Sequence, residues 1–365
     1  MTTPAPAETT PPRTSRRPLL WVAILLAVVA LTWWLHTHIA FDWRTLGHQL
    51  RTVSLGYVLA GVALIYFSFW LRAVRWAILL APLLAPGRRV RSSQLLASQL
   101  IGFTAVALIG RIADLSRPYL IARRLRLPVA SQLAIYSVER AFDLGAAAII
   151  FSVTLAFAPR NLPHHETYFR TGAISLAATL GIALFAVALR LAGAAVARVI
   201  RALLSPLSVN LATKISDRVL DFREGLQTIS SLKEFFAALA TSLLMWAMIA
   251  LAYLASARAF TSEPSLAHLS FTATMLVLAT SLGGSLFQLP VLGWFTQIAI
   301  NAAALHGFFN VPLETATACA TVMFFVATLD IIPAGLIAAR IQGTSLRDAV
   351  NESGTVRNPE TAPLT

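Results

Sequence analysis

Charged residues are scarce in this 365-residue chain. They make up 12% of it, against 57% for hydrophobic residues, and the mean hydropathy is +0.71. Soluble chains average about 25% charged residues, so there are too few charges here to cover a water-exposed surface. The apolar residues also come in uninterrupted blocks of membrane-spanning length. Composition therefore excludes a water-soluble globule and predicts an integral membrane protein that crosses the bilayer several times.

Cysteine and lysine are almost missing. The single cysteine, Cys319, lies inside an apolar block, which excludes a disulfide within the chain and a cysteine-based metal site. The seven histidines are scattered, and the adjacent pair His164 and His165 has no third ligand at useful spacing, so we expect no metal. The chain contains no G-x-x-x-x-G-K-[ST] loop, and we expect no nucleotide or other cofactor. The only lysines, Lys214 and Lys233, are far outnumbered by arginines, which hints at a GC-rich bacterial genome.

The net charge of +13 comes from arginines that sit between the apolar blocks and form no separate basic domain. We therefore interpret them as topology signals and contacts to anionic lipid, and we expect no nucleic-acid partner. Counting the basic residues beside each block places both termini in the cytoplasm of a bacterial plasma (inner) membrane.

The apolar blocks define one membrane domain at residues 19–340. The preceding residues 1–18 are rich in Pro, Thr and Ala and are predicted to be disordered, as is the tail 343–365. The first block, 19–35, follows a basic segment and is predicted to be a retained signal anchor. A cytoplasmic connector at about 194–233 contains an amphipathic helix at 211–229. The remaining apolar blocks lie at about 55–71, 94–110, 128–158, 171–189, 235–257, 268–286, 291–306 and 314–338.

Two of these regions do not read as simple spans. Block 94–110 is short and has arginines at both ends, which predicts a re-entrant hairpin that enters and leaves on one side. The arms 268–286 and 291–306 flank Gly283, Gly284 and Pro290, and are either full spans or a second hairpin entering from the opposite side. We thus predict an all-α polytopic bundle of about six to eight spans with one or two re-entrant hairpins and a possible inverted repeat.

Charged residues occur inside block 128–158, at Glu139, Arg140 and Asp143. An unpaired charge there costs roughly 2.5 to 3.5 kcal/mol, so these side chains are expected to face the bundle interior. Glu139 and Asp143 share a helical face, and Arg140 can pair with Asp143 three residues later.

A second cluster precedes this span. Arg111, Asp114 and Arg117 recur at three-residue spacing, and the planar fork of an arginine suits a phosphate group. An anionic or zwitterionic lipid headgroup is therefore a suitable ligand, with the acids pairing the arginines when the site is empty. The alternative is a closed salt-bridge network that locks the helices together.

The stretch GRIADLSRPYLIARRLRLPVASQLAIYSVERAFDL resembles the signature region of the lysylphosphatidylglycerol synthase membrane domain, the flippase-like family. The two charged clusters occupy the positions of that family's Gly-Arg, acid and Glu-Arg pattern. The upstream RAVRW also resembles the family's entry into its first cytoplasmic loop, and adds Arg72 and Arg75. Family members often carry a Pro-Gly-Gly-Leu-Gly turn followed by Glu, whereas this chain has SLGGSLFQLPVLGWFTQ, with Gln297 about where the acid would stand.

The resemblance implies a lipid flippase or transporter without a synthase domain. The residues expected to bind the lipid are Arg111, Asp114, Arg117, Glu139, Arg140, Asp143, Arg72 and Arg75. Two other functions stay open. One is a membrane transferase on an isoprenoid-linked or phospholipid substrate, with Asp114, Glu139 or Asp143 as base or metal ligand, and the other is a non-transporting accessory subunit.

Overall fold

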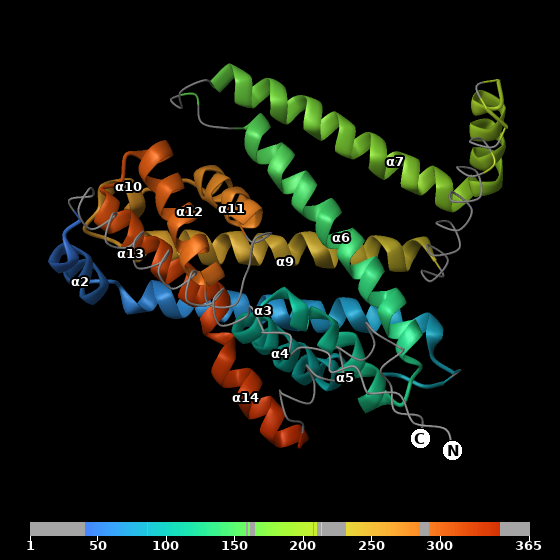
Figure 1. The fold of residues 1–365 in the computed structure, drawn as a ribbon, viewed down its shortest axis with the longest axis horizontal. Helices are drawn as coiled ribbons and strands as arrows, with labels where there is room; N and C mark the ends of the chain where they lie inside the picture. The colour runs from blue at the N-terminus through green and yellow to red at the C-terminus, as the bar shows by residue number, and fades with distance from the viewer. Residues whose placement is uncertain are drawn as a thin grey trace, which may run out of the picture.

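The computed structural model describes residues 41–85, 87–157, 160, 165–206, 208–209, 213, 231–284 and 292–343. Throughout this part of the chain the regular structure is helical, which confirms the all-α prediction (Figure 1). The expected tails, the signal anchor at 19–35 and the amphipathic helix at 211–229 lie outside the described residues. The helices are α2 (Trp43–Arg51), α3 (Leu55–Leu80), η1 (Ala81–Leu83), α4 (Ser92–Ile109), η2 (Arg111–Leu115), α5 (Ser116–Leu125), α6 (Val129–Ala156), α7 (His165–Leu204), α9 (Leu232–Arg258), α10 (Pro264–Ala267), α11 (Phe271–Gly284), α12 (Leu292–Phe309), α13 (Leu313–Phe324), the π-helical turn η4 (Phe325–Leu329) and α14 (Ile331–Gln342).

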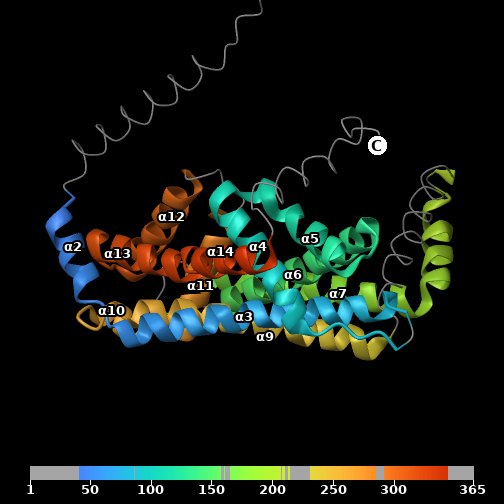
Figure 2. The ribbon, with the colours of Figure 1, turned by 90° about the horizontal axis from the view of Figure 1, so that it is seen from below.

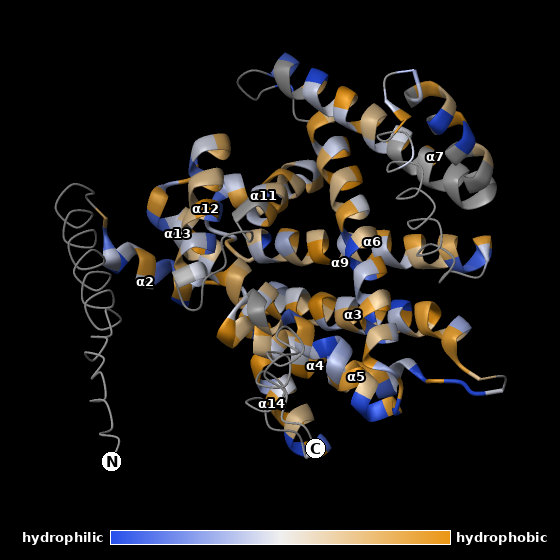
Figure 3. Ribbon diagram, turned by 45° about the vertical axis from the view of Figure 1, so that its right-hand side comes forward, coloured by the Kyte–Doolittle hydropathy of each residue, from blue (hydrophilic) through white to orange (hydrophobic). Residues whose placement is uncertain are grey.

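Four helical segments in the described chain are long and apolar enough to cross a membrane. They are Leu55–Leu83, Ser92–Ile109, Leu232–Arg258 and Leu313–Gln342. Hydrophilic residues gather instead on α5, whereas α3 and α9 are coloured mostly as apolar or intermediate (Figure 3). This distribution fits a multi-pass membrane protein.

Two helix boundaries differ from those predicted. α3 runs on to Leu80 instead of ending near residue 71, so Arg72 and Arg75 lie within the helix and not in a loop. α7 begins at His165 and continues to Leu204. The helix therefore starts before the predicted block 171–189 and extends into the expected connector at 194–233. Positive charges usually mark the ends of spans, but the end predicted from them for α3 is wrong, because those arginines find carboxylate partners.

The centre of the fold is an antiparallel pair of long helices, α3 and α9, which lie side by side in both ribbon views (Figures 1 and 2). The N–H of Ser54 donates to the carbonyl of Ala259 at one end (2.9 Å), and Arg75 Nη1 donates to Ser242 Oγ further along (2.8 Å). At Gly61 a Cβ atom would lie 3.4 Å from the carbonyl oxygen of Ala252. Small residues thus bring the two backbones close, as in membrane helix pairs generally.

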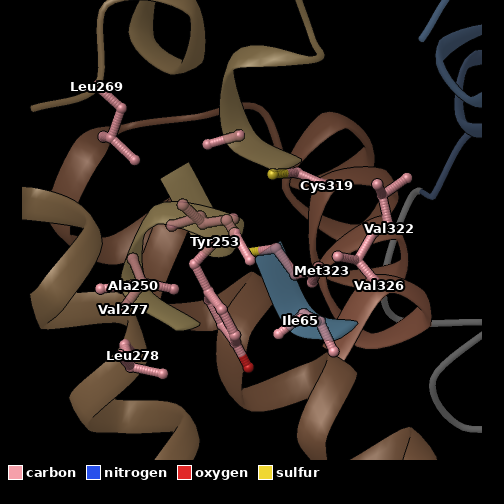
Figure 4. Close-up of a cluster of buried hydrophobic side chains, with 14 of the residues drawn as sticks. Ile65, Ala250, Tyr253, Leu269, Val277, Leu278, Cys319, Val322, Met323 and Val326 are labelled. Carbon is pink, nitrogen blue, oxygen red and sulfur yellow. The ribbon is translucent and has the colours of Figure 1, made fainter. Parts of the chain in front are cut away.

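The apolar core surrounds this pair. Tyr253 of α9 lies among buried side chains that include Ile65, Met323 and Val326 (Figure 4). Cys319 is fully buried in the same cluster. The core therefore joins the first half of the chain to the last third.

The first hairpin consists of α4, η2 and α5. α4 ends at Gly110, whose φ of 90° is a left-handed conformation that favours glycine. α5 then returns along α4, with Arg117 against Gly102, and Arg88 Nη2 donates to the carbonyl of Leu125 at the base (2.7 Å). The prediction that block 94–110 is itself a re-entrant hairpin is wrong, because the block is one unbroken helix, α4, of membrane-spanning length. α5 is the returning arm, so the hairpin of the structure extends beyond that block. Its position in the membrane stays a prediction.

The second hairpin consists of α11 and α12, which pack against each other. Its base lies at the other end of the central pair, where Arg258 Nη2 donates to the carbonyl of Leu269 (3.4 Å). Near its tip, Trp294 Nε1 donates to the carbonyl of Ala107 in the first hairpin (3.0 Å). The two hairpins therefore enter from opposite ends of the central pair and meet in the middle.

The helices of the two halves pack in equivalent pairs. The α3–α4 contact corresponds to α9–α11, the α5–α6 contact to α12–α13, and the α4–α14 contact to α11–α6. Each hairpin also ends at a left-handed residue, Arg126 (φ 52°) or Asn310 (φ 53°). This is the packing expected of an inverted repeat.

We expect Gly335→Ala to destabilise the protein, because a Cβ there would collide with Thr104 and lie 2.8 Å from the carbonyl oxygen of Leu100 on α4. Overpacking of this kind costs about 1–3 kcal/mol. Gly145→Ala is the matched control, since nothing lies within 4 Å of its Cβ position. Thermal melting in detergent should show a lower midpoint for the first variant and no loss for the second; equal midpoints would contradict the close approach of α14 to α4.

Candidate functional site

Arg75 joins α3 to α6 deep in the protein. Its side chain is buried, and its two terminal nitrogens donate to Glu139 Oε1 and Asp143 Oδ1, each at 2.7 Å. Both acids lie on one face of α6, as their four-residue spacing predicted. A single guanidinium group therefore binds two carboxylates inside the bundle.

Arg117 makes the corresponding link from the first hairpin. It is fully buried and donates to Asp114 Oδ1 (2.8 Å and 3.0 Å) and to Glu139 Oε2 (3.2 Å). A further bond reaches Gln99 of α4 at 3.2 Å, and the guanidinium carbon lies 4.4 Å from the ring centroid of Phe103. Glu139 is thereby held from α3 and α5 at once.

Arg72 and Arg140 are paired less tightly. The carboxylate contact of Arg72 is with Asp143 Oδ2 at 3.6 Å, and its Nε has no hydrogen-bond partner among the described residues. Arg140 approaches Asp143 Oδ2 at 2.9 Å, which confirms the predicted pair, and lies further from Glu139 (3.6 Å) and Asp114 (3.8 Å). Its side chain is 33% exposed.

The described cluster carries more positive than negative charge. Four guanidinium groups, those of Arg72, Arg75, Arg117 and Arg140, face three carboxylates, so the described cluster has a net charge of +1, although each arginine contacts at least one acid. The side chain of Arg111 lies outside the described part of the chain, so its predicted role stays a prediction.

A cavity adjoins the loosely paired arginines. Its first lobe measures about 240 Å³ and is lined by Arg72, Arg140 and Asp114 together with Phe103 and Gln297. Arg75, Arg117 and Glu139 are not in this lining. The structure thus separates the predicted residues whose side chains it describes into buried linkers and side chains that a ligand can touch.

The second lobe measures about 180 Å³ and continues from the first. Its lining shares Arg72 and Gln297 with the first lobe and adds Tyr253, Ser281 and Trp246. The Ser281 hydroxyl lies 2.9 Å from that of Tyr253 and accepts from Gln297 Nε2 at 3.0 Å. This lobe offers uncharged hydrogen-bonding groups.

Sequence reasoning missed most of the second lobe. Ser281 and Tyr253 are hydroxyl-bearing residues in mostly apolar helices, and neither carries a charge that marks it as costly to bury. Gln297 stands out in the sequence only because a family pattern has an acid nearby. The available signal was the pair Gln297 and Asn301, four residues apart, which both donate to Ser281 in the structure.

A comparison with known families decides what this arrangement belongs to. The family model described as the lysylphosphatidylglycerol synthase TM region matches residues 20–335. The chain belongs to that family. No curated protein matches it. Membership confirms the resemblance carried by the Gly-Arg and Glu-Arg motifs, and it makes the chain a multi-pass membrane protein of the flippase-like family.

The two kinds of arginine predict different mutant behaviour. Arg117→Met should destabilise the protein by about 3–5 kcal/mol, because it leaves buried carboxylates on Asp114 and Glu139 short of a partner. Arg140→Met removes the same charge from a partly exposed position and should shift the thermal midpoint much less. Size-exclusion profiles and melting curves of the two purified variants compare them directly; equally severe loss would mean that the whole cluster is a closed structural network.

Proposed function

We propose that the protein binds the anionic headgroup of a membrane lipid in this cavity and moves the lipid between leaflets. The observation that carries the proposal is the surplus positive charge beside a cavity lined by Arg72 and Arg140. Excess positive charge in a largely buried cluster is costly, and an anionic ligand that neutralises it lowers that cost. Phosphate fits because arginine binds it with two parallel hydrogen bonds.

The dimensions of the cavity favour a headgroup over a whole lipid. Lobes of about 240 Å³ and 180 Å³ are smaller than pockets that enclose drug-sized ligands. Acyl chains would then stay among the apolar surfaces outside, where Leu144 (72% exposed) and Phe295 (65% exposed) are examples. In the second lobe, Tyr253, Ser281 and Gln297 supply uncharged hydrogen-bonding groups beside Arg72, which suit hydroxyl or carbonyl oxygens beyond the phosphate.

The opposed hairpins supply a route for movement. Their tips meet at Trp294 and Ala107, and Ala107 lines the first lobe. Alternating access in inverted-repeat transporters proceeds by rocking of one repeat against the other around a central site. We place the protein in the bacterial inner membrane with both termini in the cytoplasm, on the distribution of its arginines.

The geometry favours transport over the transferase alternative. A general base or metal ligand needs a carboxylate that is free to accept a proton or a metal ion. Asp114, Glu139 and Asp143 each contact at least two guanidinium groups. These contacts support a role for the acids in positioning the arginines.

We expect the double variant Arg72→Gln with Arg140→Gln to lose most of its affinity for phosphatidylglycerol. A hydrogen bond to a charged group contributes about 1.5–3 kcal/mol, so losing both arginines should weaken binding at least tenfold. Native mass spectrometry of protein released from nanodiscs measures the bound lipid. Movement of fluorescent phosphatidylglycerol in sealed proteoliposomes, followed by quenching of the outer leaflet, should fall in parallel.

Arg124→Gln is the control for that experiment. Arg124 is an exposed arginine of α5 and lies outside the cavity lining, so its loss changes net charge without changing the site. Unaltered lipid binding and movement in the double variant would refute the proposal, as would an equal loss in the control.

A further inference from the structure

Asp330 is an acid that has no cationic partner among the side chains that the structure describes. It follows the π-helical turn η4 inside the apolar segment Leu313–Gln342, and it is 8% exposed. Both of its carboxylate oxygens are buried without a hydrogen-bond partner among the described residues. The hydroxyl of Tyr66 donates to the backbone carbonyl of Asp330 and not to its carboxylate (2.9 Å). Glu139, in contrast, is held by three arginines.

The groups around Asp330 do not compensate an ionised carboxylate. On α3, the titratable residue that faces it is Tyr66, and α4 carries no titratable residue at all. On α9, Tyr253 is bonded to Ser281, and on α13, Cys319 is buried in the apolar core. An ionised carboxylate in such surroundings is costly, whereas the protonated acid is not. The surroundings therefore favour the state in which Asp330 holds a proton.

The position of Asp330 connects it to both hairpins. The helix before it, α13, packs on α12 of the second hairpin, and the helix after it, α14, packs on α4 of the first. Thr104 of α4 donates to the carbonyl of the next residue, Ile331 (3.1 Å). The π-helical turn between the two helices is closed by a bond from the Asp330 N–H to the carbonyl of Phe325 (3.0 Å). Turns of this type are frequent at functional sites.

The same turn also forms part of the cavity wall. Ala327 and Thr328 line both lobes, and Ile331 lines the first lobe beside Arg72 and Arg140. A change in the hydration or charge of Asp330 would act on the backbone that carries these residues. Its effect would reach the lipid site without a direct contact between the acid and the ligand.

We propose that Asp330 is a proton-binding site that couples lipid movement to a proton gradient. The acid takes up one proton from water on one side, becomes a neutral carboxylic acid that the apolar surroundings accept, and returns the proton to water after the hairpins have shifted. No other reactant is required. This inference rests on the proposed lipid transport, and it assigns the driving step to Asp330 and not to Glu139.

The proton site can be tested without any lipid movement. Infrared difference spectra of the protein in nanodiscs, recorded between acidic and alkaline pH, should contain a carboxylic-acid carbonyl band that Asp330→Asn removes. Glu263→Gln is the matched control, an acid-to-amide change outside the long helices, and it should leave that band in place. Asp330→Leu is the second variant in case the amide alters folding. A band that survives both Asp330 substitutions would overturn the assignment.

The coupling is tested in sealed proteoliposomes with fluorescent phosphatidylglycerol. An imposed pH gradient should change the rate of lipid movement several-fold in wild type and in Glu263→Gln. Asp330→Asn should bind the lipid normally by native mass spectrometry and move it at a rate that does not respond to the gradient. A gradient response equal to that of wild type would overturn the coupling. Wild type that neither binds nor moves the lipid would refute the proposed function itself, while the infrared band would still decide the proton site.

Discussion

The pairing of Arg75 with Glu139 and Asp143 is the interaction on which the rest of the arrangement depends. Charges at this depth are tolerated only when they are paired, because neither water nor headgroups can solvate them. One guanidinium on α3 compensates two acids on α6, and Arg117 adds a second link to Glu139 from the first hairpin. The cluster fixes three helices relative to one another before any ligand is considered.

This pairing also explains why a structural network and a ligand site coexist in one cluster. Because Arg75 and Arg117 use up most of the negative charge, Arg72 and Arg140 are left with long or partial contacts beside the cavity. The arginines that line the cavity therefore lie beside a network in which most charges are already paired. Removing a buried arginine and removing a cavity-lining arginine change the net charge equally, but loss of the buried arginine should destabilise the fold much more.

Sequence reasoning reached the fold class and the Arg140–Asp143 pair, since each has a local signature in hydropathy or helical spacing. It assigned the first hairpin to block 94–110 alone, and it left the arms 268–286 and 291–306 open between full spans and a second hairpin. It placed the end of α3 too early because a positive charge normally marks the end of a span, and only three-dimensional pairing shows that Arg72 and Arg75 continue the helix. It missed the second lobe at Tyr253 and Ser281, since single hydroxyl groups in apolar helices carry no such signature. That the Asp330 carboxylate has no partner among the described residues could not be predicted either, because the neighbours of an acid are distant from it in sequence.

The left-handed residues that end the two hairpins point to the origin of the fold. In both places the left-handed residue is followed by one apolar residue and then by a proline that starts the next helix, Arg126 to Pro128 and Asn310 to Pro312. Two copies of one ancestral segment would retain such a backbone device after their side chains diverged. Aligning the two segments on it sets Glu139 opposite Met323, so the two halves share a backbone device while the acid occurs in one of them alone. A bound anion therefore meets different charges from the two halves of the fold.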